Sequence, residues 1–238
     1  MRPVPVRTRD AGFGAPASAD ASLLSTHTVL RNTYLLLSMT LLFSAAMAGL
    51  SMAIGFRGLP AHGLIMLVGM LGLMFWVNAA RNSSTGIVAV FAFTGFIGFM
   101  VGPLLSFYVQ AIPNGSQLVL MALGGTGAIF MGLSAYVLTT RKDFSFMGGF
   151  LMAGLIAIVL LSVGTLIASM FGVQVQMLSL AISAAAMLLF SAMILFDTSR
   201  IIHGGETNYI MATVALYLDI YNIFMSLLHL LGFAASDD

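Results

Sequence analysis

Apolar residues in this chain occur in long runs that charged residues interrupt only at intervals. Charge-free runs extend over residues 32–56, 58–80, 82–140 and 144–196. Because one membrane-spanning helix needs about 20 apolar residues, each of the two longest runs is predicted to hold two spans. Turn-forming residues divide these runs, at positions 113–116 and 171–176.

This pattern predicts six strong membrane-spanning helices and a seventh, weaker one. The six cover about residues 32–55, 60–80, 85–109, 117–140, 146–171 and 177–200, and the seventh covers about 209–233. Helices are expected because lipid cannot satisfy open backbone groups, and because a barrel would show short segments of alternating polarity. The predicted fold class is an all-α membrane protein. The seventh segment contains Asp219 and His229, so spanning, re-entry and burial within the bundle all stay open.

The composition supports the same class. Hydrophobic residues make up 60% of the chain and charged residues 7%, whereas a soluble domain has about 25% charged residues. The absence of cysteine excludes disulfides, thiolate metal sites and cysteine nucleophiles, and the net charge of +1 gives no reason to expect a nucleic-acid partner. Small residues such as Gly98, Gly102 and Gly132 predict close helix contacts. The eighteen methionines are interpreted as flexible gap fillers that line no particular face.

Basic residues predict the orientation. One side of the predicted spans holds Arg57, and the other side holds Arg2, Arg7, Arg9, Arg31, Arg81, Arg141, Lys142 and Arg200. The positive-inside rule therefore places the N-terminus in the cytosol. Residues 1–30 lack the apolar core of a signal peptide and are expected to form a disordered cytosolic tail, which leaves residues 31–238 as the transmembrane domain. The turn at residues 141–143 is expected to set the topology, and it is also a reasonable docking surface.

Two acids, Asp197 and Asp219, lie within apolar segments. A carboxylate at the centre of a spanning helix costs about 2.5–3.5 kcal/mol, so it needs a partner, a proton or water. Two neighbouring carboxylates do not easily both ionise in a low dielectric, so a pair would share a proton and act as a pH switch. It would also form a weak Ca²⁺ site. The alternative is that these polar groups only hydrogen-bond the bundle together.

The seventh segment has one polar or small face. At helical spacing this face comprises Asn208, Ala212, Ala215, Asp219, Asn222, Ser226 and His229. Such a stripe is expected to face a bundle or a water-filled cavity, so the helix is predicted to be central. A simple hairpin would leave Asp197 about one turn deep and Asp219 about three turns deep. Contact between them requires the sixth helix to continue towards Ile202, the seventh to begin later, or residues 203–214 to fold back.

An enzyme is not expected. Intramembrane aspartyl proteases also place two aspartates on neighbouring helices, but their YD and GxGD motifs are absent here, since Phe196 precedes Asp197 and Leu218 precedes Asp219. No phosphate-binding glycine loop and no plausible Ser/His/Asp arrangement occurs.

Four separated stretches carry a family resemblance. They are LSTHTVLRNTY from Leu24, YVLTTRKDFSFMGG from Tyr136, LFDTSRIIHGGETNY from Leu195 and LYLDIYNIFMSLLHLLG from Leu216. In this order they resemble the transmembrane Bax inhibitor-1 motif family, in particular its bacterial subgroup of FtsH protease modulators. The resemblance covers nearly the whole chain after about Leu23. It implies seven helices with the last enclosed by the other six, and a place in the bacterial inner membrane.

The resemblance also implies two functions. In the first, the chain binds the FtsH protease and its partners HflK and HflC and restrains the degradation of membrane proteins. In the second, Asp197 and Asp219 form a pH-sensing latch over a Ca²⁺ leak path, with Ca²⁺ as a permeant or weakly bound ion and no other cofactor. Leak-channel relatives have an arginine near the end of the second helix, where this chain has Asn78. Arg81, three residues further on, is the expected substitute counter-charge.

Overall fold

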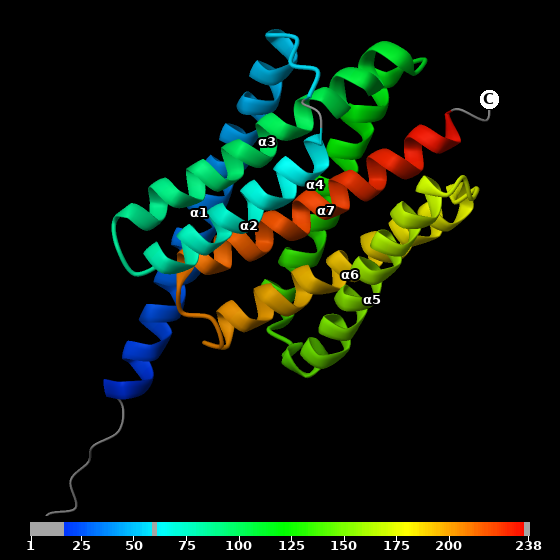
Figure 1. The fold of residues 1–238 in the computed structure, drawn as a ribbon. Coiled ribbons are helices and arrows are strands. Elements are labelled where there is room, and N and C mark those ends of the chain that lie inside the picture. The colour runs from blue at the N-terminus through cyan, green and yellow to red at the C-terminus, as the bar shows by residue number, and fades with distance from the viewer. Residues whose placement is uncertain (1–16, 59–60, 236–238) are drawn as a thin grey trace, which may run out of the picture.

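Seven long helices make up almost all of the computed structural model, which describes residues 17–58 and 61–235 and their side chains from residue 27 onward. They are α1 (Ala17–Ala53), α2 (His62–Ala80), α3 (Thr85–Ala111), α4 (Gly115–Thr140), α5 (Gly148–Met170), α6 (Gln176–Ile202) and α7 (Tyr209–Ala234), with a short 3-10 turn, η1 (Ser145–Met147), before α5 (Figure 1). The described residues contain no strand. All seven helices are long and apolar enough to cross a membrane, which confirms the predicted all-α membrane class.

The predicted boundaries of the last six helices agree with the structure to within a few residues. These boundaries follow from turn-forming residues, and Asn114 and Gly172 adopt the left-handed backbone conformation in the turns before α4 and α6. The largest difference is at the start of the chain. There α1 begins at Ala17, inside the segment 1–30 for which a disordered tail is predicted. Residues 1–16 of that segment lie outside the described residues, and for them the tail stays a prediction.

The last helix, α7, lies at the centre of the bundle. It packs against α1, α2, α3, α4 and α6, whereas α5 lies outside α6 and packs against α6 and η1. In Figure 1, α7 runs between the α1–α3 group and the α5–α6 pair. Its large side chains Leu216, Tyr217, Ile223 and Leu228 are almost completely buried.

Helix α7 also runs the full length of the bundle. At its start, Asn208 Nδ2 donates hydrogen bonds to the Arg81 carbonyl oxygen and to Asn82 Oδ1, both at 2.9 Å, in the turn before α3. At its other end, Gly232 packs directly against the ring of Tyr108, near the end of α3. Its 26 residues correspond to about 39 Å, more than the roughly 30 Å of a bilayer core. The sequence left spanning, re-entry and burial within the bundle open for this segment. The structure has a helix that is long enough to span and is buried within the bundle.

Close contact between α1 and α3 holds the other side of the core. A Cβ atom at Gly98 would collide with the backbone and side chain of Ser44, and one at Gly102 would collide with Ser51. Small residues let the two helix backbones approach, as predicted for this segment. The same expectation is wrong for Gly132, because no neighbouring atom of the described residues lies within 4 Å of the position its Cβ would take.

Candidate functional site

Asp197 and Asp219 come together in the interior. Asp197 lies on α6 and Asp219 on α7, with exposed fractions of 8% and 1%. Their carboxyl groups are within hydrogen-bonding reach of each other. The sequence allows three alternative ways to bring the two acids together, and the structure has the first, because α6 continues to Ile202. Residues 209–214 are helical and do not fold back.

The hydrogen bonding of the two acids is incomplete. Oδ2 of Asp219 is buried and has no hydrogen-bond donor among the described residues. Two ionised carboxylates offer only acceptors to one another, so their contact supplies no donor unless one of them holds a proton. A shared proton or an external donor is therefore needed to satisfy this pair.

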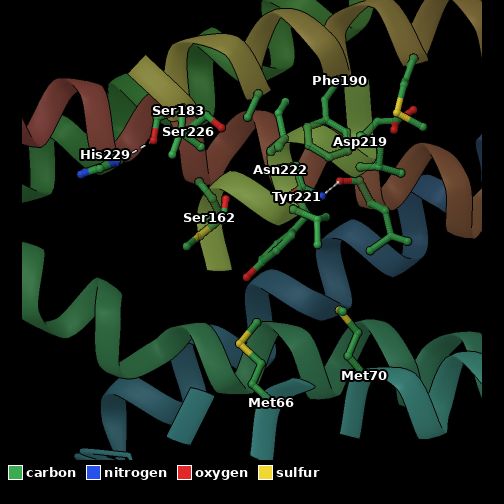
Figure 2. Close-up of a pocket in the computed structure, with 18 of the residues that line it drawn as sticks. Met66, Met70, Ser162, Ser183, Phe190, Asp219, Tyr221, Asn222, Ser226 and His229 are labelled. Carbon is green, nitrogen blue, oxygen red and sulfur yellow. Dashed lines mark hydrogen bonds between the residues drawn. The ribbon is translucent and has the colours of Figure 1, made fainter. Parts of the chain in front are cut away.

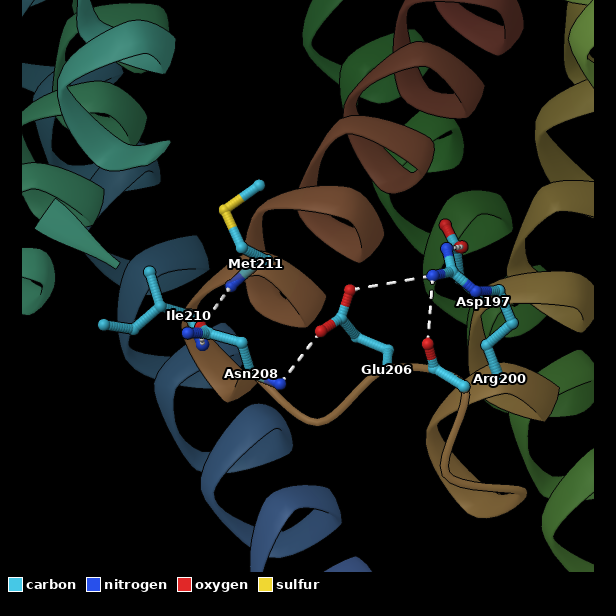
Figure 3. A network of polar contacts seen from close by, with 7 residues as sticks. Asp197, Arg200, Glu206, Asn208, Ile210 and Met211 are labelled. Carbon is cyan, nitrogen blue, oxygen red and sulfur yellow. Dashed lines mark hydrogen bonds and ion pairs between the residues drawn. The ribbon is translucent and has the colours of Figure 1, made fainter. Parts of the chain in front are cut away.

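The basic group beside the pair is Arg200, one turn along α6 from Asp197. Its Nη1 lies 4.0 Å from Asp197 Oδ1, and its Nη2 lies 3.8 Å from Glu206 Oε2 and donates to the Gly205 carbonyl oxygen at 3.1 Å (Figure 3). Because the Arg200 side chain is 37% exposed, solvent screens this ion pair and makes it weak. Asp197 thus has a neighbouring charge that is easily displaced.

Asn78 and Arg81, the positions at which a counter-charge is expected, do not contact Asp197. Neither residue is among the described residues that line the cavity around Asp197, and Arg81 makes no ion pair within the part of the chain that the structure describes. Arg81 instead accepts a hydrogen bond from Asn208 through its backbone oxygen. The sequence signal for Arg200 is its i, i+3 spacing from Asp197 on a helix. The interpretation of Arg200 as a marker of topology alone misses this contact.

Both acids line a cavity of about 930 Å³. It lies between α2 and α5, whose described Cα atoms are nowhere within 8 Å of each other, and residues of α6 and α7 line it between them. Asn222, Ser226 and His229 line the same cavity, so the part of the polar stripe from Ala215 to His229 faces it (Figure 2). His229 Nδ1 and Ser183 Oγ are 2.7 Å apart, and Asn222 Nδ2 donates to the Leu218 carbonyl oxygen at 2.8 Å.

Methionines form much of the apolar wall. Met66, Met70 and Met74 project from α2 at a spacing of four residues, and Met225 joins them from α7. This pattern corrects the expectation that the methionines line no particular face. The i, i+4 spacing on α2 is the signal that could have identified it.

Metal ligands are scarce in this cavity. No group of three or more His, Cys, Asp or Glu side chains within the described residues is placed to hold a metal ion. Two carboxylates fall short of the six to eight oxygen ligands that Ca²⁺ takes, so the pair alone would be a weak Ca²⁺ site.

A second cluster ties the loops together at the end of the bundle near Asp197. Ser199 Oγ donates to Asp143 Oδ1 at 3.3 Å and accepts from the Phe144 backbone N–H at 2.9 Å. Hydrogen bonds from Ser145 are the main reason that the pKa of Asp143 lies below its usual value. Arg81, Arg141 and Lys142 are exposed at this end, and we call these three residues the basic loop face.

Comparisons with known proteins agree with the four sequence stretches. A family described as inhibitor of apoptosis-promoting Bax1 matches residues 26–236. A protein of Escherichia coli K12 named modulator of FtsH protease YccA is 55% identical over 217 residues, which cover 91% of this chain and 94% of that protein. Its counterpart in Escherichia coli O6:H1, named inner membrane protein YccA, has the same identity and coverage. An uncharacterized membrane protein of Vibrio cholerae is 50% identical over 216 residues, 90% of this chain and 93% of that protein. The chain belongs to the Bax inhibitor-1 family.

Proposed function

We propose that this chain is an inner-membrane modulator of the FtsH protease, that it binds FtsH together with HflK and HflC, and that it restrains degradation of membrane proteins without being an enzyme itself. The observation that carries the proposal is the 55% identity to the modulator of FtsH protease YccA across 91% of the chain. Identity at this level over all seven helices favours a shared mode of action over a shared fold alone.

The basic loop face is the surface that we assign to the partner. Asn208 ties the turn before α3 to the start of α7, and Ser199 ties the loop after α4 to α6. These bonds hold Arg81, Arg141 and Lys142 on a connected support, and a fixed charge pattern favours specific docking. By the positive-inside rule we expect this face in the cytosol.

Co-purification from mild detergent tests the proposal. The tagged chain is expected to recover FtsH, HflK and HflC, and its overproduction is expected to slow turnover of an FtsH substrate. The double variant Arg141→Glu, Lys142→Glu should reduce recovery severalfold, because it reverses two charges on the docking face. Gln174→Glu, in the exposed loop between α5 and α6, is the matched control and should bind as the unmodified chain does. No recovery of FtsH together with unchanged substrate turnover would contradict the proposal.

A second candidate function is a pH-sensitive cation leak, with Ca²⁺ as the permeant ion. The observation in its favour is that the Asp197–Asp219 contact lies in a cavity whose lining extends along α7 from Met211 to His229. At about 1.5 Å per residue this stretch of helix is roughly 27 Å long, close to the roughly 30 Å of a bilayer core. Proton loss from the pair would add repulsion and draw in water or cations.

Reconstituted liposomes test this second function. Ca²⁺ flux is expected to change between about pH 6 and 8, and Asp197→Asn or Asp219→Asn should abolish that change because each variant removes one of the two coupled carboxyl groups. Asp143→Asn, outside the cavity, should leave it intact. Absence of flux at every pH, or an unchanged pH response in both cavity variants, would exclude the leak.

A further inference from the structure

The cavity between α2 and α5 has an unbalanced charge. Asp197 and Asp219 are both part of its lining, and among the described residues that line it there is no Lys or Arg. Arg200 approaches Asp197 at 4.0 Å but is itself partly exposed and is not part of the lining. His229 lies far from the acids along α7 and pairs with Ser183. Charge complementarity therefore favours a cationic occupant over a neutral or anionic one.

Asp219 supplies a specific point of attachment. The residue is 1% exposed, and its Oδ2 has no donor among the described residues. A buried acceptor without a donor is costly, and a ligand N–H would relieve that cost. A protonated amine suits this position because it brings both the positive charge and the missing hydrogen-bond donor.

The rest of the cavity suits an apolar body. Met66 and Met70 lie on one side of the opening, and Asp219, Tyr221 and Asn222 lie on the other (Figure 2). Methionine side chains are flexible and adapt to apolar ligands of different shapes. The volume of about 930 Å³ falls within the roughly 300–1,000 Å³ of small-molecule sites, which are mostly apolar with a few polar groups.

We propose that this cavity binds a lipophilic primary amine in its protonated form. The ammonium group donates a hydrogen bond to Asp219, and the apolar chain lies against the methionines of α2. A hydrated metal ion fits less well, because the apolar wall supplies none of the additional oxygen ligands it needs. The ammonium of a phospholipid stays at the membrane surface, whereas Asp219 lies about 15 Å along α7 from Tyr209. We place the entry from the bilayer between α2 and α5, whose described Cα atoms are nowhere within 8 Å of each other.

Photolabelling of the full-length protein in phosphatidylcholine nanodiscs tests this proposal. The probe is decylamine that carries a photoreactive diazirine on its chain. Label is expected on the peptide that contains Met66 and Met70, and unlabelled decylamine should displace the probe while decanoate and decanol should not. Asp219→Asn should reduce labelling about ten- to hundredfold, the effect of losing one buried charged hydrogen bond. Asp143→Asn keeps the cavity unchanged and should label normally.

A second variant separates loss of binding from loss of folding. Met70→Trp keeps both acids and fills part of the cavity, so it should also reduce labelling, and circular dichroism checks that each variant is helical. Equal labelling in the unmodified chain and in a folded Asp219→Asn variant would overturn the proposal. Equal displacement by decylamine and decanol would overturn it too. The readout contains no protease, so failure to bind FtsH and failure to bind the amine are distinguishable.

Discussion

Asn208 joins two parts of the bundle through one amide side chain. Its Oδ1 accepts hydrogen bonds from the backbone N–H groups of Ile210 and Met211, which otherwise have no helical partner at the start of α7. Its Nδ2 donates to Arg81 and Asn82 in the turn before α3. An amide is the side chain that provides both an acceptor and a donor here.

Replacing Asn208 with alanine removes the cap and the bridge together. We expect Asn208→Ala to lower the free energy of unfolding by about 1–2 kcal/mol, measured by thermal unfolding in detergent. Asn208→Ser is the matched variant, because the serine hydroxyl keeps an oxygen that can cap the helix and lacks the Nδ2 donor. It should cost less than alanine. Equal losses in the two variants would show that the cap contributes nothing.

Asp143 carries a pH-dependent contact at the same end of the bundle. Because hydrogen bonds from Ser145 and a favourable interaction with His203 lower its pKa from the usual 3.8, its stabilising effect is present above 3.8 and is lost as the pH falls through the lower value. The melting temperature of Asp143→Ala should therefore lie below that of the unmodified chain at pH 6. The difference in melting temperature should shrink as the pH falls below 3.8 and through the lowered pKa of Asp143. A difference that does not change with pH would show that the charge of this carboxylate has no role.

At the scale of helices, glycines in similar sequence surroundings differ in whether they lie at a helix–helix contact. Gly98 lies where α3 touches α1 through Ser44, whereas no neighbouring atom of the described chain lies within 4 Å of the position that a Cβ atom at Gly124 would take. Both residues lie in apolar runs with small neighbours at helical spacing. Only the first belongs to a helix interface.

The two positions should respond differently to alanine. Gly98→Ala forces α1 and α3 apart and should lower the free energy of unfolding by about 1–3 kcal/mol. Gly124→Ala adds a methyl group in open space and should be neutral or slightly stabilising, since alanine favours the helix. Chemical unfolding in detergent measures both. The interface assignment fails if Gly98→Ala is as stable as Gly124→Ala.

At the scale of the whole molecule, the loops divide between two ends. The start of α1 and the loops before α3, after α4 and after α6 lie at one end, and the end of α7 lies at the other (Figure 1). An odd number of full-length helices produces this arrangement. With all seven helices across the bilayer, we expect the two ends of the described chain on opposite sides of the membrane.

Single cysteines can report the two sides, because the chain has no cysteine of its own. Lys142→Cys lies in the loop after α4, and Gln174→Cys lies in the exposed loop between α5 and α6. We expect a membrane-impermeant maleimide to label Gln174→Cys in intact spheroplasts and Lys142→Cys only in inverted vesicles. The reverse result would invert the proposed orientation, and labelling of both positions from one side would contradict the seven-helix topology.

The sequence by itself determined the class of protein, the number of helices and most of their ends. These features depend on local properties, namely the length of apolar runs and the turn residues at positions such as Asn114 and Gly172. The polar stripe of α7 also indicated a central helix, because a lipid-facing carboxylate is costly.

Only the tertiary structure decided what the buried acids meet. The contact between Asp197 and Asp219 depends on how far α6 continues and on how it crosses α7. The i, i+3 spacing places Arg200 beside Asp197, whereas the distance of Arg81 from the pair depends on how the turn before α3 packs. The cavity lies where no Cα atom of α2 comes within 8 Å of a described Cα atom of α5, a relation between helices that are distant in the chain. The periodicity of apolar residues predicts which face of a helix is buried, but it does not predict which other helix packs against that face.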